Sequence, residues 1–354
     1  MYLKRRSTMK YLLAACAGAA LYSEWFTYII QPWYWPGLSC NARDQSCIKV
    51  LFIADPQIQG DLAVPPPARY IYNWDSDRYL RSSFTVVMNH FKPDVLVYLG
   101  DLMDEGSVST MPQFHGYVNR LSKIFETDNP IVQVWLPGDN DIGGENEPIR
   151  NEKVLEFDKI FDQPLVINFK NVTFYKVNGI THSYPMKGNE NNNLKIIVSH
   201  YPLTNRYSLI NQIIKEIEPN IFFCAHDHES KYVKQSQDLT HRSTHTFENR
   251  NEILNILFSD NELYEIYVPT CSYRMGTNKI GFGAAVIENN YQKIRYAVFW
   301  SPPRFPHLIL YLGILIFVLI YCLIFCTPGL FLKQPRTSRH SNSNYDKAAL
   351  LERI

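Results

Sequence analysis

Five short apolar runs set the strongest constraint on how this chain folds, because each one is followed closely by a residue that can bind a metal ion. The runs cover residues 50–53, 95–99, 131–136, 196–198 and 221–224. Runs of this length and of this Val, Ile, Leu and Phe content are typical of strands that are buried on both faces of a parallel sheet. We therefore expect the polar residues behind them to lie on loops at the strand ends.

The segments between and after these runs indicate a layered α/β fold. Helix-like stretches occupy 76–91, 111–125 and 207–217. Three later strand-like segments, at 265–268, 284–287 and 294–299, have few helices between them and suggest a second sheet packed on the first. The polar stretches 189–193 and 235–251 are expected to be loops.

The polar blocks contain carboxylates and imidazoles in a fixed order. They are Asp55, then Gly100 and Asp101 with Asp104, then Gly138, Asp139, Asn140 and Asp141, then His200, and last the pair His226 and His228. Open α/β sheets place their active sites at the carboxyl ends of strands, so these blocks should converge. Together they predict a site for two metal ions that acts on phosphoesters.

Phosphoester hydrolysis explains why such residues should meet. The reaction needs an attacking hydroxide at neutral pH and neutralisation of charge on the phosphoryl oxygens, and two divalent ions about 3.5 to 4 Å apart supply both. Asp101 is the expected bridge between the ions, since Gly100 before it lets the backbone approach closely. The expected ligands are Asp55, Asp101 and His228 for one ion and Asp101, Asp139, His200 and His226 for the other. Mixed carboxylate and imidazole ligands suit Mn²⁺, Zn²⁺ or Fe rather than Ca²⁺.

Composition excludes two classes of protein. The chain has 354 residues with 46% hydrophobic and 14% aromatic content, which excludes a disordered chain. Its 35 Lys and Arg residues are balanced by 34 Asp and Glu. The excess positive charge that nucleic-acid binding favours is missing, so no nucleic-acid partner is expected.

Two apolar segments near the ends predict a membrane protein. Residues 308–325 carry no charge, and at about 1.5 Å per residue a helix of this length nearly spans a hydrocarbon core of about 30 Å. Near the N-terminus a basic stretch precedes the apolar segment 11–30, which fits either an uncleaved anchor or a signal peptide. The basic residues at both ends should stay cytosolic under the positive-inside rule, so the body of the protein should be lumenal.

Two smaller features agree with a lumenal location. Cys40 and Cys47 flank a short polar loop and are placed to form a disulfide. Asn171 begins an Asn-Val-Thr glycosylation sequon between the strand-like runs 165–169 and 172–177, where a hairpin tip is expected.

The ordered blocks resemble the calcineurin-like metallophosphoesterase superfamily over residues 48–297, with its usual motifs D-x-H, G-D-x-x-D, G-N-H-D, an isolated H and G-H-x-H. The stretches Asp101 to Gly106, Asp141 to Gly143 and His200 to Leu203, with the two flanking spans, are similar to a narrower group. That group consists of endomembrane enzymes that remove ethanolamine phosphate from a mannose of glycosylphosphatidylinositol (GPI) anchors. The resemblance implies a four-layer α/β/β/α sandwich with flanking transmembrane helices, two divalent ions with manganese expected, and GPI-anchored proteins as substrates. It also implies residence in the endoplasmic reticulum and early Golgi membrane, and promotion of ER-to-Golgi transport of GPI-anchored proteins.

Three residues depart from the superfamily pattern. Gln57 stands where a metal-binding His is usual, so it is expected to be a weak ligand at most. Asp139 replaces an Asn ligand and should retain coordination. Asn140 replaces the His that contacts the phosphate or protonates the leaving group, and Asp141 keeps its usual place beside it. Asn140 and Asp141 are therefore the expected catalytic positions, with the normal proton donor missing.

The predicted organisation follows from these features. It comprises a cytosolic N-terminus (1–10), a signal anchor or signal peptide (11–30), a lumenal linker (31–47), a metallophosphoesterase domain (48–300), a joint (301–307), a transmembrane helix (308–327) and a cytosolic tail (328–354). Two functions remain open at this point. One is an active phosphodiesterase acting on GPI glycans, and the other is a metal-retaining module that binds GPI-anchored cargo without turnover.

Overall fold

The computed structural model describes residues 2–41, 44–128, 130–186, 188, 193–236, 241–258, 262–288 and 290–326. The chain divides into two units, Met1–His307 and Leu308–Ile354. The predicted cytosolic tail, 328–354, lies outside the described residues.

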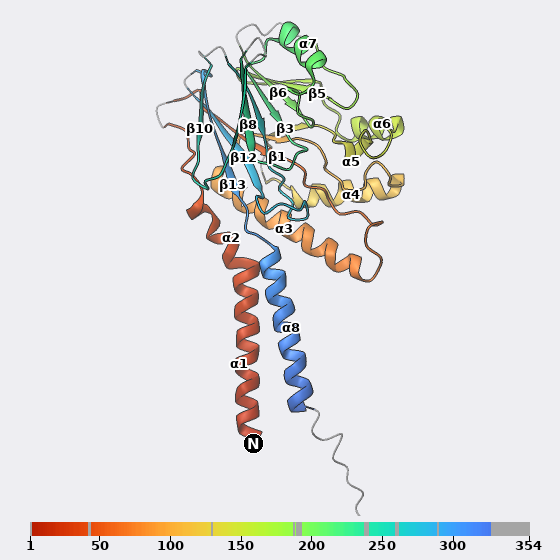
Figure 1. Ribbon diagram of the computed structural model, residues 1–354, viewed down its shortest axis with the longest axis vertical. Coiled ribbons are helices and arrows are strands. Elements are labelled where there is room, and N and C mark those ends of the chain that lie inside the picture. Colours follow the sequence, from red (N-terminus) through yellow and green to blue (C-terminus); the bar gives the residue numbers. More distant parts are fainter. Residues whose placement is uncertain are drawn as a thin grey trace, which may run out of the picture. The chain divides into compact units, whose positions relative to one another are not determined.

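The first unit contains two β-sheets with helices between the strands in sequence (Figure 1). The α-helices are α1 (Tyr2–Leu21), α2 (Thr27–Ile29), α3 (Ala68–Phe91), α4 (Met111–Ile124), α5 (Asp139–Ile142), α6 (Asn151–Ile160), α7 (Tyr207–Ile217) and α8 (Phe305–Cys326), the last of which starts in the first unit and continues in the second. The strands are β1 (Ile48–Ile53), β2 (Val95–Tyr98), β3 (Val132–Trp135), β4 (Val166–Phe169), β5 (Val172–Val177), β6 (Leu194–Ser199), β7 (Ile221–Cys224), β8 (Lys231–Ser236), β9 (Arg242–Thr246), β10 (Leu254–Leu257), β11 (Glu262–Tyr267), β12 (Gly281–Glu288) and β13 (Lys293–Trp300).

The described strands form one sheet in the order β10-β13-β12-β1-β2-β3 and another in the order β4-β5-β6-β7-β11-β8-β9. In the first sheet β1, β2 and β3 are parallel. In the second, β5, β6, β7 and β11 are parallel. The five apolar runs of the sequence are therefore confirmed as strands β1, β2, β3, β6 and β7, and each sheet has parallel carboxyl ends for a site.

The two sheets pack face to face with helices on their outer faces. Phe52 of β1 stacks on Phe223 of β7 with ring centroids 4.0 Å apart, inside a continuous apolar core shared by both sheets. On the outer face of the first sheet, Phe84 of α3 packs edge-on against Phe125, which in turn meets Tyr98 of β2. On the outer face of the second sheet, Ile210 and Ile213 of α7 are fully buried. This gives the α/β/β/α layering that was expected.

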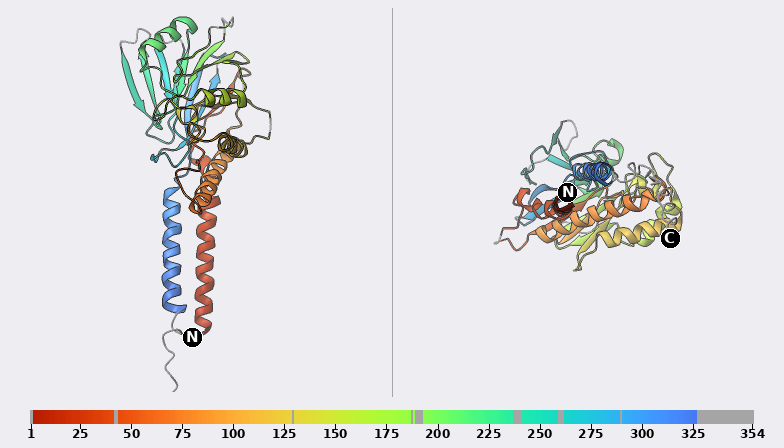
Figure 2. Two further views of the ribbon diagram at one scale, coloured as in Figure 1. Left: turned by 90° about the vertical axis from the view of Figure 1, so that its right-hand side faces the viewer. Right: turned by 90° about the horizontal axis from the view of Figure 1, so that it is seen from below.

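The three predicted helices are present, and local chemistry explains where α4 begins. Thr110 and Gln113 bond each other at the start of α4, with the Gln113 carbonyl oxygen accepting from the Thr110 backbone N–H at 2.9 Å. This is a capping arrangement that satisfies an otherwise free amide. Helix α3 starts at Ala68, eight residues before the predicted start, and its first turns are rich in aromatic residues. The right-hand view of Figure 2 shows α3 along its length, with α4 beside it.

The expectation that the three late segments share one second sheet is wrong. Strand β11 lies in the second sheet, but β12 and β13 return to the first, where β12 pairs antiparallel with β1 from Ile48↔Ile287 to Phe52↔Gly283. The close approach of the two sheets explains why small residues occur in β12. A Cβ on Gly283 would lie 2.8 Å from the Tyr296 hydroxyl of β13 and 3.0 Å from a methyl of Val268.

The predicted loop 235–251 contains a strand. Strand β9 pairs antiparallel with β8 and lies at the edge of the second sheet with all its residues exposed. A strand whose two faces both meet water carries no apolar alternation, so the pattern that reveals buried strands was missing. Of the other predicted loop, residues 189–192 lie outside the described residues.

Among the described residues, only the stretch Phe305–Ile324 is long and apolar enough to cross a membrane. The predicted second span at 11–30 is not shown. Its apolar half is built largely of alanine and glycine, and its second half packs on the domain: Ser23, Thr27 and Tyr28 are buried, and the Tyr28 ring meets that of Tyr79 at 6.2 Å. The expected linker and joint are also packed, since Trp35 Nε1 donates to the carbonyl of Trp300 at 2.8 Å and the Tyr79 hydroxyl donates to the carbonyl of Pro302 at 2.9 Å.

Two local predictions are confirmed. Cys40 and Cys47 form a disulfide. Strands β4 and β5 form a hairpin in which Phe169 faces Val172, so the exposed Asn171 lies at the tip. Glycosylation of Asn171 stays a prediction.

Candidate metal centre

All six expected metal ligands lie where strands of the two sheets end. Asp55, Asp101 and Asp139 follow β1, β2 and β3 of the first sheet, and His200, His226 and His228 follow β6 and β7 of the second. The site is therefore built from both sheets. The backbone there is unusual, because non-glycine residues with positive φ include Asp55 (47°), Gln57 (43°), Asp101 (49°), His226 (69°) and His228 (55°). Such conformations cost free energy and gather at functional sites.

Two glycines allow the loops to approach one another. A Cβ on Gly100, which has φ of 96°, would lie 2.8 Å from the Gly138 nitrogen and 2.8 Å from Nδ1 of His200. A Cβ on Gly138 would lie 2.1 Å from Oδ1 of Asp101. Any side chain at either position would therefore push the ligand loops apart.

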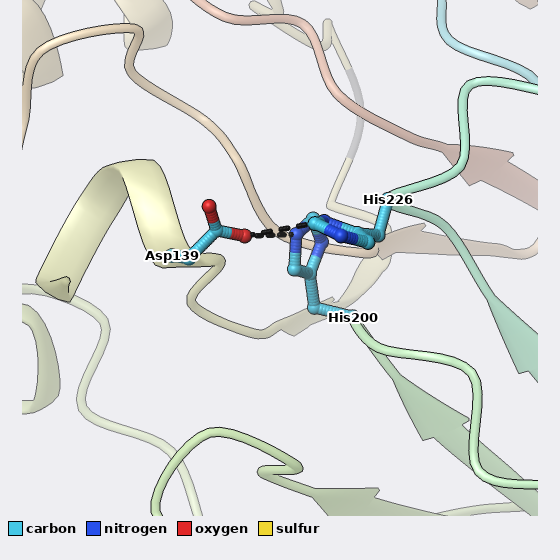
Figure 3. Close-up of side chains that lie close together, drawn as sticks. All are labelled: Asp139, His200 and His226. Carbon is cyan, nitrogen blue, oxygen red and sulfur yellow. Dashed lines mark hydrogen bonds and ion pairs between the residues drawn. The ribbon is translucent and has the colours of Figure 1, made fainter. Parts of the chain in front are cut away.

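Asp139, His200 and His226 form one cluster (Figure 3). One carboxylate oxygen of Asp139, Oδ1, lies 3.0 Å from Nε2 of His200 and 3.3 Å from Nδ1 of His226. Burial by itself opposes ionisation of Asp139, but the bonds from the two imidazoles outweigh it and hold its pKa below the usual range. Three ligand atoms from three loops thus converge on one point.

The ring of His200 is held in the orientation that a metal ligand needs. Its Nδ1 donates to the carbonyl of Leu99 at 2.9 Å, which turns Nε2 toward the carboxylates. A bond of this kind on the second ring nitrogen is the usual support of a metal-bound histidine. Burial lowers the pKa of His200, but Asp101, Asp139 and Asp55 together outweigh it and raise the pKa to about 10. Metal binding would displace this proton, since only the neutral imidazole is a ligand.

Asp55, Asp101 and His200 form the second cluster. Asp55 is fully buried, and neither of its carboxylate oxygens has a hydrogen-bond donor among the described residues. The nearest cationic group, Nδ1 of His200, is 3.8 Å away. Burial and the neighbouring Asp101 carboxylate raise the pKa of Asp55, with His200 and the nearby backbone N–H of His226 opposing them. A buried carboxylate without donors is costly unless a cation neutralises it, so this pair of oxygens fits a bound metal ion.

Two of the three residues that depart from the superfamily pattern, Gln57 and Asn140, contact Asp101. Oδ2 of Asp101 accepts from the side-chain amide of Asn140 at 2.7 Å and from that of Gln57 at 3.1 Å, while Oδ1 accepts from the Asn140 backbone at 3.0 Å. Nε2 of Gln57 also lies 3.4 Å from Nε2 of His228. Gln57 therefore occupies the place between Asp101 and His228 where an ion shared by them would be bound.

Asp141 has a supporting position. It is fully buried, and its carboxylate accepts from the backbone N–H groups of Leu102, Met103 and Gly138 at 3.1, 2.9 and 2.8 Å. Burial and the nearby Asp101 raise its pKa to about 7. Because both of its oxygens accept hydrogen bonds from backbone amides, Asp141 holds the loops after β2 and β3 together. Asp141 would therefore affect the reaction by positioning these loops.

The described residues fit a two-metal site. The clusters supply carboxylate and imidazole donors in the mixture that transition metals prefer, and the structure leaves the buried Asp55 oxygens without donors. Asp55, Asp101, Asp139, His200, His226, His228 and Gln57 all lie within or beside the two clusters. Their roles as ligands stay predictions.

Three further residues surround the Asp139 cluster and were not expected from the sequence. Glu145 lies 3.9 Å from Nε2 of His226, and burial together with the Asp139 carboxylate raises its pKa. The ring of Tyr201 packs edge-on against His226 at 4.4 Å, and the guanidinium of Arg206 lies over that ring at 4.6 Å. All three line a hollow beside His226. Tyr201, next to His200, could have been found from the sequence, whereas Glu145 and Arg206 carry no spacing signal.

Two more polar residues hold the site loops in place. Arg274, from the loop after β11, donates to the Gln57 carbonyl at 2.9 Å and pairs with Asp104 at 2.6 Å. Glu265 of β11 is fully buried and accepts from the Leu203 backbone at 2.6 Å and from the Thr204 hydroxyl. Arg274 thus fixes the turn after Asp55, and Glu265 fixes the loop that follows His200.

Comparison with known proteins agrees with this geometry. The family model described as "Calcineurin-like phosphoesterase" matches residues 48–230, which is more than half of the chain and contains every expected ligand. The chain belongs to this family. Membership supports a metal-dependent phosphoester hydrolase in general, and the match confirms the predicted superfamily.

Individual relatives match over part of their length. Metallophosphoesterase 1 of Ailuropoda melanoleuca is 28% identical over 183 residues, covering 50% of this chain and 45% of that protein. Metallophosphoesterase 1 of Danio rerio is 26% identical over 173 residues, covering 48% and 44%. The chain thus spans less than half the length of these relatives. A crystal structure of a metallophosphoesterase from Sphaerobacter thermophilus is 15% identical with a TM-score of 0.37, covering 71% of this chain and 88% of that one.

Proposed function

We propose that this member of the family is a two-metal phosphodiesterase that removes ethanolamine phosphate from a mannose of GPI-anchor glycans. In this proposal manganese is the metal, the domain is lumenal in the endoplasmic reticulum and early Golgi membrane, and the reaction promotes ER-to-Golgi transport of GPI-anchored proteins. The proposal refines a general activity, hydrolysis of phosphoesters, to which the family match alone leads.

The observation that carries the two-metal part of the proposal is the pair of buried Asp55 oxygens without hydrogen-bond partners among the described residues. A chain that only displayed a binding surface would gain nothing from burying an unpaired carboxylate among Asp101 and Asp139, because such burial costs free energy. The same arrangement is useful if two ions neutralise it and are presented to a substrate.

Three features support the choice of substrate and compartment. The matched relatives carry the name Metallophosphoesterase 1, and the motifs Asp101 to Gly106 and His200 to Leu203 resemble the GPI-remodelling group. The Cys40–Cys47 disulfide favours an oxidising compartment. The apolar stretch Phe305–Ile324 would keep the domain at a membrane, where a lipid-linked glycan is found.

The side chains around the centre suggest how a phosphodiester is bound and cleaved. When bound, the metals supply charge neutralisation and an activated water. Arg206, in the hollow beside His226, offers a positive charge for a phosphoryl oxygen, and Tyr201 forms an aromatic wall for the group attached to it. Asn140 can donate a hydrogen bond but no proton, so the leaving alkoxide must take its proton from water or be stabilised by a metal.

One observation favours a second function, a metal-retaining module that binds GPI-anchored cargo. Gln57 and Asn140 both donate to the single oxygen Oδ2 of Asp101. If both bonds persist with metal bound, they weaken Asp101 as a bridge and leave the site able to bind but slow to turn over.

The test uses full-length protein in detergent with Mn²⁺ and a GPI glycan that carries ethanolamine phosphate on mannose. We expect mass spectrometry to detect release of ethanolamine phosphate by the wild type and none by Asp101→Asn. Hydrolysis of bis-p-nitrophenyl phosphate without release from the glycan would retain the phosphodiesterase and reject the substrate. Binding of the glycan with no hydrolysis of either compound would favour the binding module.

A further inference from the structure

The chain enters its candidate span directly beside helix α3. The span begins at Phe305. Just before it, the Pro302 carbonyl accepts from the Tyr79 hydroxyl at 2.9 Å, and Nε of Arg304 donates to the Asp75 carboxylate at 3.1 Å. Arg304 is almost fully buried by these contacts. Positions 302–304 directly precede the first residue of the candidate span, so the residues bonded to them lie close to where the chain enters it.

The first turns of α3 carry large apolar side chains that the domain does not cover. Tyr70, Ile71, Tyr72 and Trp74 are 64%, 69%, 54% and 62% exposed. From Asp75 onward the same helix buries its inner face against the first sheet. The exposed turns therefore directly precede Asp75, the residue that bonds Arg304 just before the span begins.

The N-terminal segment adds an exposed aromatic residue beside the start of the span. Tyr22 meets His307 with ring centroids 6.0 Å apart, so the segment passes the start of the span. Trp25, which is 65% exposed, follows Glu24, and Glu24 pairs with Arg78 of α3. We use the term aromatic surface for Tyr70, Ile71, Tyr72, Trp74 and Trp25.

Arginines accompany the aromatic surface. The guanidinium of Arg69 lies 5.4 Å from the Tyr70 ring centroid and that of Arg78 lies 5.3 Å from the Trp74 ring centroid. Both arginines also pair with carboxylates, Arg69 with Asp61 at 3.4 Å and Arg78 with Glu24, so each holds its charge beside an aromatic ring. Exposed Trp and Tyr with adjacent Arg are the residues that settle at the level of lipid head groups, where one end of the side chain is apolar and the other is wet.

We propose that the aromatic surface lies in the head-group layer of the membrane that holds Phe305–Ile324. In this proposal the first turns of α3 lie in phospholipid, and its later turns pack in the domain. This contact removes apolar area from water and adds a second attachment to that of the candidate span. The contact is independent of which phosphoester is the substrate.

The test places a photoreactive residue on the aromatic surface of the full-length protein in nanodiscs of palmitoyl-oleoyl phosphatidylcholine. p-Benzoylphenylalanine replaces Tyr70 or Trp74 in separate variants, and both are aromatic substitutions at exposed positions. After irradiation we expect intact-protein mass spectrometry to show the added mass of one phospholipid in each variant. The same residue at Ile71 provides a third position if either variant fails to fold.

Two controls make each outcome decisive. Leu155 on α6 is 70% exposed, and the same replacement there should give no lipid adduct. Phe317 within the span should give one. An adduct at Phe317 without one at positions 70, 71 and 74 would overturn the proposal, as would equal adducts at Leu155. Cross-links from position 70 to a second copy of the chain would instead identify a protein interface. If the Phe317 variant gave no lipid adduct, Phe305–Ile324 would not be a membrane span, and the proposal would be wrong.

Discussion

Two buried carboxylates in this protein, Asp75 and Asp55, have opposite surroundings. Asp75 on α3 accepts from the Arg304 guanidinium at 3.1 Å and from the Tyr273 hydroxyl at 2.9 Å. Burial alone would raise its pKa, but these bonds outweigh it and lower the pKa. Asp55 after β1 has no donor among the described residues, and its pKa is raised by burial.

The difference separates a structural site from a reactive one. At Asp75 the protein supplies the compensating positive charge from its own side chains, so the pair stabilises the fold as it stands. At Asp55 the compensation is left to something the protein binds. His200 is the positively charged side chain that lowers the pKa of Asp55, whereas the neighbouring carboxylates of Asp101 and Asp139 add negative charge and raise it. Replacing each residue by its isostere should therefore separate stability from activity.

The largest effect is expected for Asp55→Asn. Loss of a metal ligand should lower hydrolysis by about 10³-fold, because a metal ion contributes several kcal/mol to the transition state and each 1.36 kcal/mol is about tenfold. Metal content should fall, while the melting temperature of metal-free protein should be unchanged or higher. Asp162→Asn, at an exposed position, is the control. If metal-free Asp55→Asn lost as much stability as Asp75→Asn does, the contrast between a structural Asp75 and a metal-binding Asp55 would be wrong.

Asp75→Asn should do the reverse. Arg304 would keep Glu24 at 2.9 Å but lose its buried carboxylate, so we expect a cost of about 1.5 to 3 kcal/mol in the free energy of unfolding, with metal content retained in the folded protein. Because the folded pKa of Asp75 is lowered, its stabilisation is present above the unfolded pKa of about 3.9 and is lost as pH falls through the lower folded value. Denaturant titrations of wild type and variant should therefore differ at pH 7 and converge in acid. A constant difference at every pH would contradict the assigned pair.

Asn140→His tests the altered half of the centre. An imidazolium at position 140 can protonate a leaving group, and general acid catalysis typically contributes about 10² to 10⁴-fold. We expect a gain near the lower end of this range for esters with alkyl leaving groups and little for activated aryl esters, which leave without a proton. Steady-state rates for both ester types measure the contrast. Equal gains would show that position 140 acts on the phosphoryl oxygens instead.

The smallest effect is expected for Gln57→His. An imidazole between Asp101 and His228 should tighten binding of one ion by at least about tenfold, which corresponds to about 1.4 kcal/mol. Competition with a chromogenic chelator would resolve the two ions. Tighter binding of both ions, or of neither, would show that Gln57 does not belong to one ion's ligand set.

Much of the fold could be predicted from the sequence, because its signals are local. Runs such as 95–99 are too apolar and too short for anything but buried strands, and the polar residues behind them belong to loops for the same reason. The hairpin at Asn171 and the Cys40–Cys47 disulfide also depend on near neighbours.

What could not be predicted depends on contacts between distant segments. The return of β12 and β13 to the first sheet depends on register with β1, and the exposed strand β9 carries no apolar signal at all. Arg274 and Glu265 support the site from the strand β11 region, more than 30 residues beyond the last ligand, His228. A single charged residue in a loop has no spacing that would mark it as a partner of a motif elsewhere.

The sequence by itself determined which residues can bind metals and that they follow strands, since residue type and apolar periodicity are written in the chain. Only the tertiary structure decided that these residues come from two sheets, that the oxygens of Asp55 are left without donors, and that the first turns of α3 stay uncovered. The physical reason is that burial and hydrogen-bond satisfaction belong to the assembled packing. The type of a residue shows which ligands it can bind, whereas its neighbours in space show whether its hydrogen-bonding groups and its charge already have partners.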